Sequence, residues 1–222
     1  DAPARGADGD ALLGAVEEIG LLLREHGAAG EAARRPTPAA MQAMREAGLF
    51  RLFTPRSLGG LEVDPVTGAR LIEAAARFDS AAGWAIMVAN SVDWWCSRLP
   101  TEGAEEIYAN GPDPIIASAF QPPVGAGART GGHRLSGRSP LASNVHDADW
   151  LMLTARLAGE NGEPVTIGAI VPAREADVIE TWHSLGMRGT DSNDVAVDDV
   201  FVPAARTFVI GPEFEPGRHH QG

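Results

Sequence analysis

The chain has 222 residues, and 44% of them are apolar, so it can bury a hydrophobic core in one large domain or two modest ones. Its 30 acidic and 18 basic residues give a formal net charge of -12. This charge excludes nucleic acid and anionic membrane surfaces as expected partners, because both need clustered Lys and Arg side chains to neutralise phosphate groups.

The cysteine and histidine content argues against disulfide and metal sites. Cys96 is the only cysteine, so no disulfide can form within the chain, and a reducing compartment is favoured. The six histidines show no metal-ligand spacing with cysteine or carboxylates. The longest run of low charge, residues 81–92, is too short to cross a bilayer. We therefore expect a soluble, cytoplasmic protein without a bound metal ion.

Helical periodicity dominates the first half of the chain. Residues 1–10 are small and polar, and we expect them to fray. Thr37–Pro38 and Asp64–Pro65 each combine a capping side chain with a proline at the first helical position, which indicates two helix starts. Between these two helices, Leu49–Arg56 has the pattern of an apolar extended segment. The predicted helices span residues 11 to about 30, 38–48, 65–78, 81–99 and 101–108.

The helix predicted over residues 81–99 is apolar on all sides, which is typical of a helix buried at the centre of a helical domain. It carries Trp84, Trp94 and Trp95. Their helical spacing favours core packing, and a cavity wall for an aromatic substrate is the less favoured alternative.

After Pro114 the apolar residues alternate, as they do in β-strands. The predicted strands are residues 115–120, 129–136, 150–157, 165–171, 178–184 and 194–202. Helices followed by strands predict an α+β fold. We expect an N-terminal helical bundle domain over residues 1–111, followed by an antiparallel β-barrel or sandwich domain with a C-terminal tail over residues 112–222.

Residues 131–156 differ from the other segments. They have the pattern of a glycine turn, a strand, an irregular polar connection and a second strand. The connection holds small polar side chains, including Ser143 and Asn144. Such groups at the end of a core strand can aim hydrogen-bond donors at a polar heterocycle. For this segment taken alone, a solvated connection between strands is the favoured interpretation.

Four motifs together resemble the acyl-CoA dehydrogenase superfamily. They are residues 53–65 (FTPRSLGGLEVDP), 76–85 (ARFDSAAGWA), 131–156 (above) and 185–203 (LGMRGTDSNDVAVDDVFVP). Their order and spacing are similar to those of the N-terminal helical domain and middle β-domain of that family. The last motif is the most specific, and its wording is more similar to the flavin-dependent monooxygenase branch than to the dehydrogenases proper.

This resemblance implies a flavin cofactor, FMN or FAD, held against the β-domain. Ser143 would lie near flavin N5 and O4, and Leu141 would lie beside the ring. The residues implied to contact the flavin are Gln121, Pro123, Gly125, Leu141, Ser143, Trp182, Thr190 and Ser192. Those implied to face the substrate are Trp84, Asn90 and Ser91.

The chain also departs from the family pattern. Leu141 stands at a position that is aromatic in the family, Ser139 where the monooxygenase branch has Trp, and Asn144 where Gly is usual. The sequence ends at Gly222, where the C-terminal helical bundle of the family would begin. Because that bundle supplies the catalytic base in the family, no catalytic residue is assigned. We expect a homo-oligomer, or a second subunit that supplies the bundle.

The resemblance favours a flavin-dependent oxidoreductase, specifically a monooxygenase that uses reduced flavin on an aromatic or natural-product small molecule, with a flavin reductase as a partner. One alternative is an acyl-CoA dehydrogenase, which carries out α,β-dehydrogenation of an acyl thioester. The other alternative is a non-catalytic partner or binding module that has lost the flavin chemistry.

Overall fold

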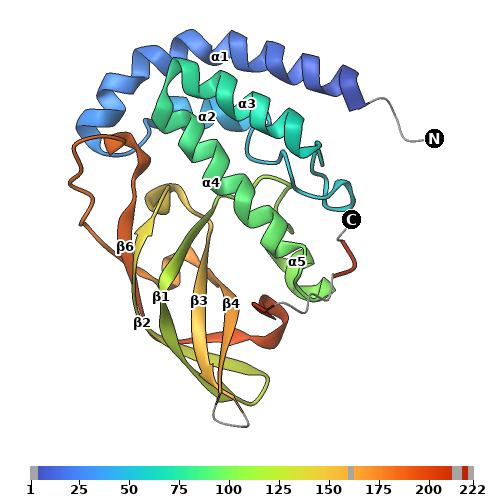
Figure 1. Ribbon diagram of the computed structural model, residues 1–222, viewed down its shortest axis with the longest axis vertical. Coiled ribbons are helices and arrows are strands. Elements are labelled where there is room, and N and C mark those ends of the chain that lie inside the picture. Colours follow the sequence, from blue (N-terminus) through green and yellow to red (C-terminus); the bar gives the residue numbers. More distant parts are fainter. Residues whose placement is uncertain (1–4, 160–162, 212–216, 220–222) are drawn as a thin grey trace.

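Within the residues that the computed structural model describes (5–159, 163–211 and 217–219), five α-helices precede seven β-strands (Figure 1). The helices are α1 (Arg5–Ala33), α2 (Pro38–Glu46), α3 (Pro65–Phe78), α4 (Ser80–Cys96) and α5 (Thr101–Ile107). The strands are β1 (Ile116–Arg129), β2 (Gly132–Ala142), β3 (Trp150–Ala158), β4 (Pro164–Pro172), β5 (Asp177–Ile179), β6 (Asn193–Pro203) and β7 (Thr207–Val209). This order confirms the predicted fold class. The domain boundary that we propose near Gly111 falls between α5 and β1.

Capping side chains set the starts of three helices. Thr37, Asp64 and Asp79 precede α2, α3 and α4, and each accepts a hydrogen bond from a backbone N–H of the first turn. These bonds satisfy donors that have no partner inside the helix, so the chain enters each helix at a fixed residue. The starts predicted for the second and third helices are confirmed.

Two predictions about the helical half were wrong. Residues 5–10 belong to α1, although we expected a frayed segment there; residues 1–4 lie outside the described residues. Leu49–Arg56 is a series of turns and not an extended segment. Its backbone folds back on the next residues, because Leu61 N donates to Arg51 O and Val63 N donates to Leu52 O, at 2.9 and 2.8 Å.

The seven strands form one sheet in the order β5-β6-β2-β1-β3-β4-β7. All neighbours are antiparallel except β1 and β3, which run parallel. The strand predicted over residues 178–184 ends at Ile179. From Thr181 the backbone N–H groups bind the side chain of Asn193 and not a neighbouring strand. The sequence pattern did not reveal β7, which has only three residues.

Helix α4 lies between α3 and the sheet (Figure 1). Eleven of its residues are buried, which agrees with the central position predicted for it. Its C-terminal half shares a core with the strands, where Val92 and Trp95 pack with Met152, Ile170 and Phe208. The Trp95 ring stacks on Phe208 with centroids 5.8 Å apart. Core packing is thus confirmed for Trp95 and was wrong for Trp84 and Trp94, which are 41% and 48% exposed.

Helix α5 approaches the β-half through a glycine. A Cβ atom placed on Gly103 would lie 1.7 Å from the backbone oxygen of Ala205, far inside van der Waals contact. Only a residue without a side chain permits this approach. The helical and β-halves therefore pack together at a distance that Gly103 sets.

A buried carboxyl group lies inside the helical half. Asp93 on α4 is 1% exposed and accepts hydrogen bonds from Tyr108 OH at 2.7 Å and Thr54 Oγ1 at 2.9 Å. Burial raises the pKa of Asp93 from 3.8 to about 7, and the two hydrogen bonds only partly oppose this effect. Near neutral pH the folded protein therefore holds a substantial fraction of Asp93 in its neutral form.

We predict that Gly103→Ala destabilises the fold by at least roughly 1–3 kcal/mol, because the added methyl group collides with rigid backbone. Gly14→Ala is the matched control, since a Cβ at Gly14 in α1 meets nothing within 4 Å. That control should gain roughly 0.4–1 kcal/mol by reducing the entropy of the unfolded chain. Urea unfolding measures both; equal stabilities for the two variants would contradict the close approach at α5.

We predict that Asp93→Asn removes a pH dependence of stability. Because folding raises the pKa of Asp93, the folded state binds this proton more tightly than the unfolded chain does. The stability that this group contributes is complete below about pH 4 and is lost as pH rises to about 7, by roughly 4 kcal/mol across that range.

Asn can keep both hydrogen bonds at position 93. Its Oδ1 would accept from Tyr108 and its Nδ2 would donate to Thr54, whose own proton can go to Pro112 O at 3.2 Å. Urea unfolding free energies between pH 4.5 and 8 should fall more steeply for the natural protein than for Asp93→Asn. Parallel pH profiles would show that Asp93 is not titrating in this range.

Candidate functional site

Four side chains from three parts of the chain form one hydrogen-bonded row between α4 and the sheet. Trp84 on α4 donates Nε1–H to Ser143 Oγ at 3.0 Å. Ser143 directly follows β2, and its Oγ lies 2.8 Å from Ser192 Oγ. Thr190 Oγ1 lies 2.7 Å from Ser192 Oγ and donates to the backbone oxygen of Met187 at 2.9 Å. We call Trp84, Ser143, Ser192 and Thr190 the polar row.

Left-handed backbone conformation turns the chain at the end of β2. Leu141 and Asn144 have φ angles of 64° and 60°. Asn adopts such angles more readily than most residues, which explains how Asn144 can occupy this turn. Asn144 N donates to Thr190 O at 3.1 Å, and Asn144 Nδ2 donates to Ala85 O at 3.0 Å. One residue thus ties the turn to both α4 and the segment before β6.

Gly189, the second glycine of the motif GMRGT, lets the segment before β6 approach helices α1 and α4. A Cβ atom on Gly189 would lie 3.1 Å from the Cβ of Ala81 in α4 and 3.5 Å from the backbone carbon of Gly30 in α1. The first distance is tighter than ordinary contact and the second is an ordinary contact, so a side chain at this position would need Ala81 or the segment to shift by a few tenths of an ångström. Gly189 therefore holds the neighbouring Thr190 close to α4.

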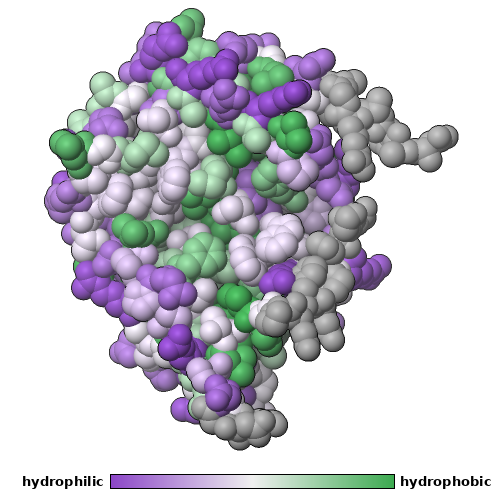
Figure 2. Space-filling model, viewed as in Figure 1, coloured by the Kyte–Doolittle hydropathy of each residue, from purple (hydrophilic) through white to green (hydrophobic). Residues whose placement is uncertain are grey.

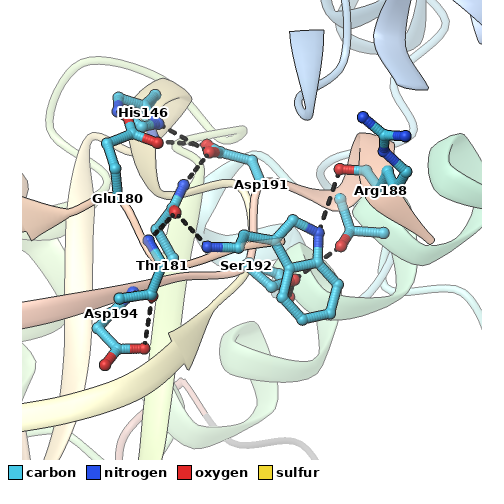
Figure 3. Close-up of polar contacts among 11 residues, drawn as sticks. His146, Glu180, Thr181, Arg188, Asp191, Ser192 and Asp194 are labelled. Atoms are coloured by element: carbon cyan, nitrogen blue, oxygen red, sulfur yellow. Dashed lines mark hydrogen bonds and ion pairs between the residues drawn. The ribbon is translucent and has the colours of Figure 1, made fainter. Parts of the chain in front are cut away.

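Asp191 organises the turn beside the polar row (Figure 3). Its carboxylate is 1% exposed and accepts from the backbone N–H of His146 at 2.7 Å and from Asn193 Nδ2 at 2.9 Å. The ring Nδ1 of His146 lies 2.7 Å from the same carboxylate, and its Nε2 lies 3.2 Å from Glu180. Partial burial, together with the charge of Asp191, raises the pKa of nearby Asp147.

Trp182 is held by this turn. Its backbone N–H donates to Asn193 Oδ1 at 2.9 Å, and its indole Nε1–H points at the backbone oxygens of Met187 and Arg188, each at 3.1 Å. Sequence reasoning missed Asp191 and Asn193. Their signal was their place within the most specific motif, between and beside the hydroxyl residues Thr190 and Ser192.

Exposed apolar side chains flank the polar row. Trp84 is 41% exposed and Leu141 is 58% exposed, whereas Ser143, Thr190 and Ser192 are buried. Figure 2 shows that apolar and weakly polar surface runs down the middle of one face of the molecule, with hydrophilic surface toward its margins. A few buried hydroxyls beside an apolar surface can bind a flat, mostly apolar molecule with polar edges.

Three residues expected to contact the flavin, Gln121, Pro123 and Gly125, lie in β1 and not in the polar row. Gln121 and Gly125 are exposed and Pro123 is half-buried. Among the hydrogen bonds of the described residues, none joins these three to the polar row. Ser139 donates to Pro122 O at 3.1 Å, which ties this part of β1 to β2.

Asn90 and Ser91 were expected to face a substrate. Asn90 is fully buried, and both its Oδ1 and its Nδ2 make two hydrogen bonds. Three of these bonds link α4 to residues 49–53, and the fourth goes to Ile86 O within α4. It leaves no hydrogen-bonding position for a substrate. Ser91 donates to Val88 O within its own helix. Asn90 therefore has a packing role that the sequence did not reveal.

The described residues hold no cluster of three or more His, Cys, Asp or Glu side chains arranged for a metal ion. Within the same residues, no helix is long and apolar enough to cross a membrane.

The chain is similar to known proteins over most of its length. Residues 17–107 match the family model described as acyl-CoA dehydrogenase, N-terminal domain. The chain is 32% identical over 203 residues to the oxygenase component of an FADH2-dependent resorcinol hydroxylase from Rhizobium sp. (strain MTP-10005), covering 90% of this chain and 49% of that protein. It is 34% identical to an indole-3-acetate monooxygenase from Pseudomonas putida, covering 77% and 44%.

A solved structure shows the same fold. The Streptomyces sp. protein XiaF, determined in complex with FADH2 and glycerol, superposes with a TM-score of 0.88 at 31% identity, covering 92% of this chain and 52% of that chain. This chain spans about half the length of the curated relatives it matches. Residues 17–107 thus match the N-terminal domain of the acyl-CoA dehydrogenases, and the chain is similar to about half the length of flavin-dependent monooxygenases.

Proposed function

We propose that this chain forms the flavin-binding half of a monooxygenase that uses reduced flavin to hydroxylate an aromatic or natural-product small molecule. The observation that carries this proposal is the polar row. Three buried hydroxyls and an indole N–H meet at the position where the resemblance puts the polar edge of the flavin ring. The matched relatives named as a resorcinol hydroxylase and an indole-3-acetate monooxygenase support the same reaction class.

The residues present fit a flavin by their chemistry. The ring is flat and largely apolar, with its polar atoms along one edge, and it needs an apolar wall with a few fixed hydrogen-bonding groups. Trp84, Leu141 and Trp182 supply apolar surface, while Ser143 and Ser192 supply hydroxyls. FMN and FAD share this ring, so the proposal covers both. When bound in its reduced form, the flavin supplies the electrons that activate molecular oxygen.

The chain's own residues position the reactants. Ser143 would hold the polar edge of the ring, in an orientation that its bonds to Trp84 and Ser192 fix. The exposed part of Trp84 would offer an aromatic substrate a surface to stack on. Leu141, which the resemblance places where the family has an aromatic residue, would contact the ring with less apolar area than an aromatic side chain.

A flavin reductase is the proposed source of reduced flavin, which the similarity to a protein named as the oxygenase component of a hydroxylase supports. Helix α4 also exposes large apolar surface, since Trp84 is 41% exposed and Trp94 is 48% exposed. Such surface favours contact with further protein, so we retain a homo-oligomer or a second subunit as part of the proposal.

Acyl-CoA dehydrogenation is less well supported than hydroxylation, since the relatives described above are named as a hydroxylase and monooxygenases of aromatic compounds. A partner module without flavin chemistry is the remaining alternative. Flavin binding distinguishes it from both enzymes, because only the enzymes require the cofactor.

We predict saturable binding of FMN or FAD, measured by flavin fluorescence and absorbance with the reduced forms handled anaerobically. Ser143→Ala should weaken binding roughly 3- to 10-fold, the effect of one lost hydrogen bond. Thr207→Val is the matched control, because Thr207 donates only to a local carbonyl, Ala204 O. Absence of binding by both flavins would support the partner module and contradict the proposed function.

A further inference from the structure

His146 lies between two carboxyl groups that come from different parts of the chain (Figure 3). Its ring Nδ1 lies 2.7 Å from Asp191 Oδ1, and its ring Nε2 lies 3.2 Å from Glu180 Oε1. Asp191 is 1% exposed, and among the ion pairs of the described residues its cationic partner is His146. Both ring nitrogens therefore lie within hydrogen-bond distance of a carboxyl oxygen.

Two ionised carboxylates facing one ring require a proton on each ring nitrogen, because an ionised carboxylate can only accept. The neutral imidazole carries one N–H donor, so one of its nitrogens would turn a lone pair toward an acceptor. The imidazolium form carries two N–H donors and a positive charge, and it fits both contacts. The geometry thus suits a charged His146, held between the buried Asp191 and the exposed Glu180.

Asp191 links His146 to a residue of the candidate site. Its carboxylate also accepts from the backbone N–H of His146 at 2.7 Å and from Asn193 Nδ2 at 2.9 Å. The other end of that amide, Asn193 Oδ1, accepts from the backbone N–H of Trp182 at 2.9 Å. The position of Trp182 therefore depends on Asn193, whose orientation depends on Asp191.

The backbone of Asp191 affects two hydroxyls of the polar row. Its φ angle is 52°, in the left-handed region that residues with a side chain adopt uncommonly. The side-chain bonds of Asp191 stabilise this conformation, which also determines how the chain runs from Thr190 to Ser192. Loss of those bonds would let both hydroxyls shift.

We propose that His146 is a positioning residue of the flavin site, whose imidazolium form holds Asp191 and, through it, Trp182, Thr190 and Ser192. This inference rests on the proposed function, which places the flavin beside these three residues. Deprotonation of the ring would remove the N–H that faces a carboxylate and leave a buried carboxylate without its counter-charge. Flavin binding should then weaken as pH rises.

Other charged groups act in the same region. Asp147 follows His146 in the sequence, and the charges of Asp191, Arg35 and Arg45 act on it. Asp147 can titrate as well, so the contribution of His146 is measured as the difference between the natural chain and a variant at position 146.

The experiment measures dissociation constants of oxidised FMN and FAD from about pH 5.5 to about pH 8.5, which covers the range where histidine usually changes charge. His146→Asn can keep a hydrogen bond to Asp191 but cannot become charged. Glu180→Gln removes the charge of the exposed partner. His183→Asn is the matched control, because the ring Nδ1 of His183 lies 3.2 Å from Arg34 Nη1 and, among the described contacts, not beside a carboxylate.

The natural chain should bind both flavins less tightly at the high end of this pH range than at the low end. The loss should be roughly 3- to 10-fold larger than in His146→Asn, the effect of weakening a contact to a charged group. Glu180→Gln should reduce the loss, and His183→Asn should keep the natural profile. Titration of the flavin itself is common to all four proteins and cancels in the comparison.

The outcomes separate this inference from the function on which it rests. Flavin binding with the natural pH profile in His146→Asn and Glu180→Gln overturns the inference and leaves the proposed function standing. Equal weakening at every pH also overturns it, because that is the effect of structural damage alone, as does a flattened profile in His183→Asn. If His146→Asn does not fold, Glu180→Gln decides. No flavin binding by the natural chain at any pH overturns both.

Discussion

Hydrogen bonds between buried polar groups join α4 to the sheet, and the position of the candidate site depends on them. An unpaired buried donor or acceptor is more destabilising than a typical hydrogen bond is stabilising. Helix α4 meets the sheet through Trp84 and through the backbone oxygen of Ala85, which pair with Ser143 and Asn144. These bonds set the position of the turn after β2, and Asn144 N in turn holds Thr190. The hydroxyls of the candidate site therefore take their positions from the way the two halves of the chain pack.

Much of the fold was predictable because its local signals agree with its tertiary packing. Thr37 and Asp64 cap helices where the sequence places them, and the uniformly apolar α4 is the central helix. The parallel pairing of β1 with β3 and the short strand β7 were not predictable, since neither has a local pattern. The turns between residues 49 and 56 depend on long-range bonds, above all those of Asn90, which no periodicity reveals.

The candidate site was predictable only in part, and only through the family resemblance. The family resemblance singled out Trp84, Ser143, Thr190 and Ser192. The structure brings these four residues into one row, although Trp84 and Ser143 are 59 residues apart in the sequence. It did not single out Asp191, because a buried carboxylate that orders a turn has the same local signal as an exposed one. The role of the row in binding flavin stays a prediction.

The central claim is that the indole of Trp84 is hydrogen-bonded to Ser143 across the two halves of the chain. The most direct test is to measure by NMR how fast the indole N–H groups of the five tryptophans exchange with solvent. A Trp84→Phe variant assigns the Trp84 signal. We expect the Trp84 N–H to exchange slowly although the side chain is 41% exposed, and Ser143→Ala to speed its exchange. A Trp84 N–H that exchanges as fast as that of a free indole, and does not respond to Ser143→Ala, would contradict this account.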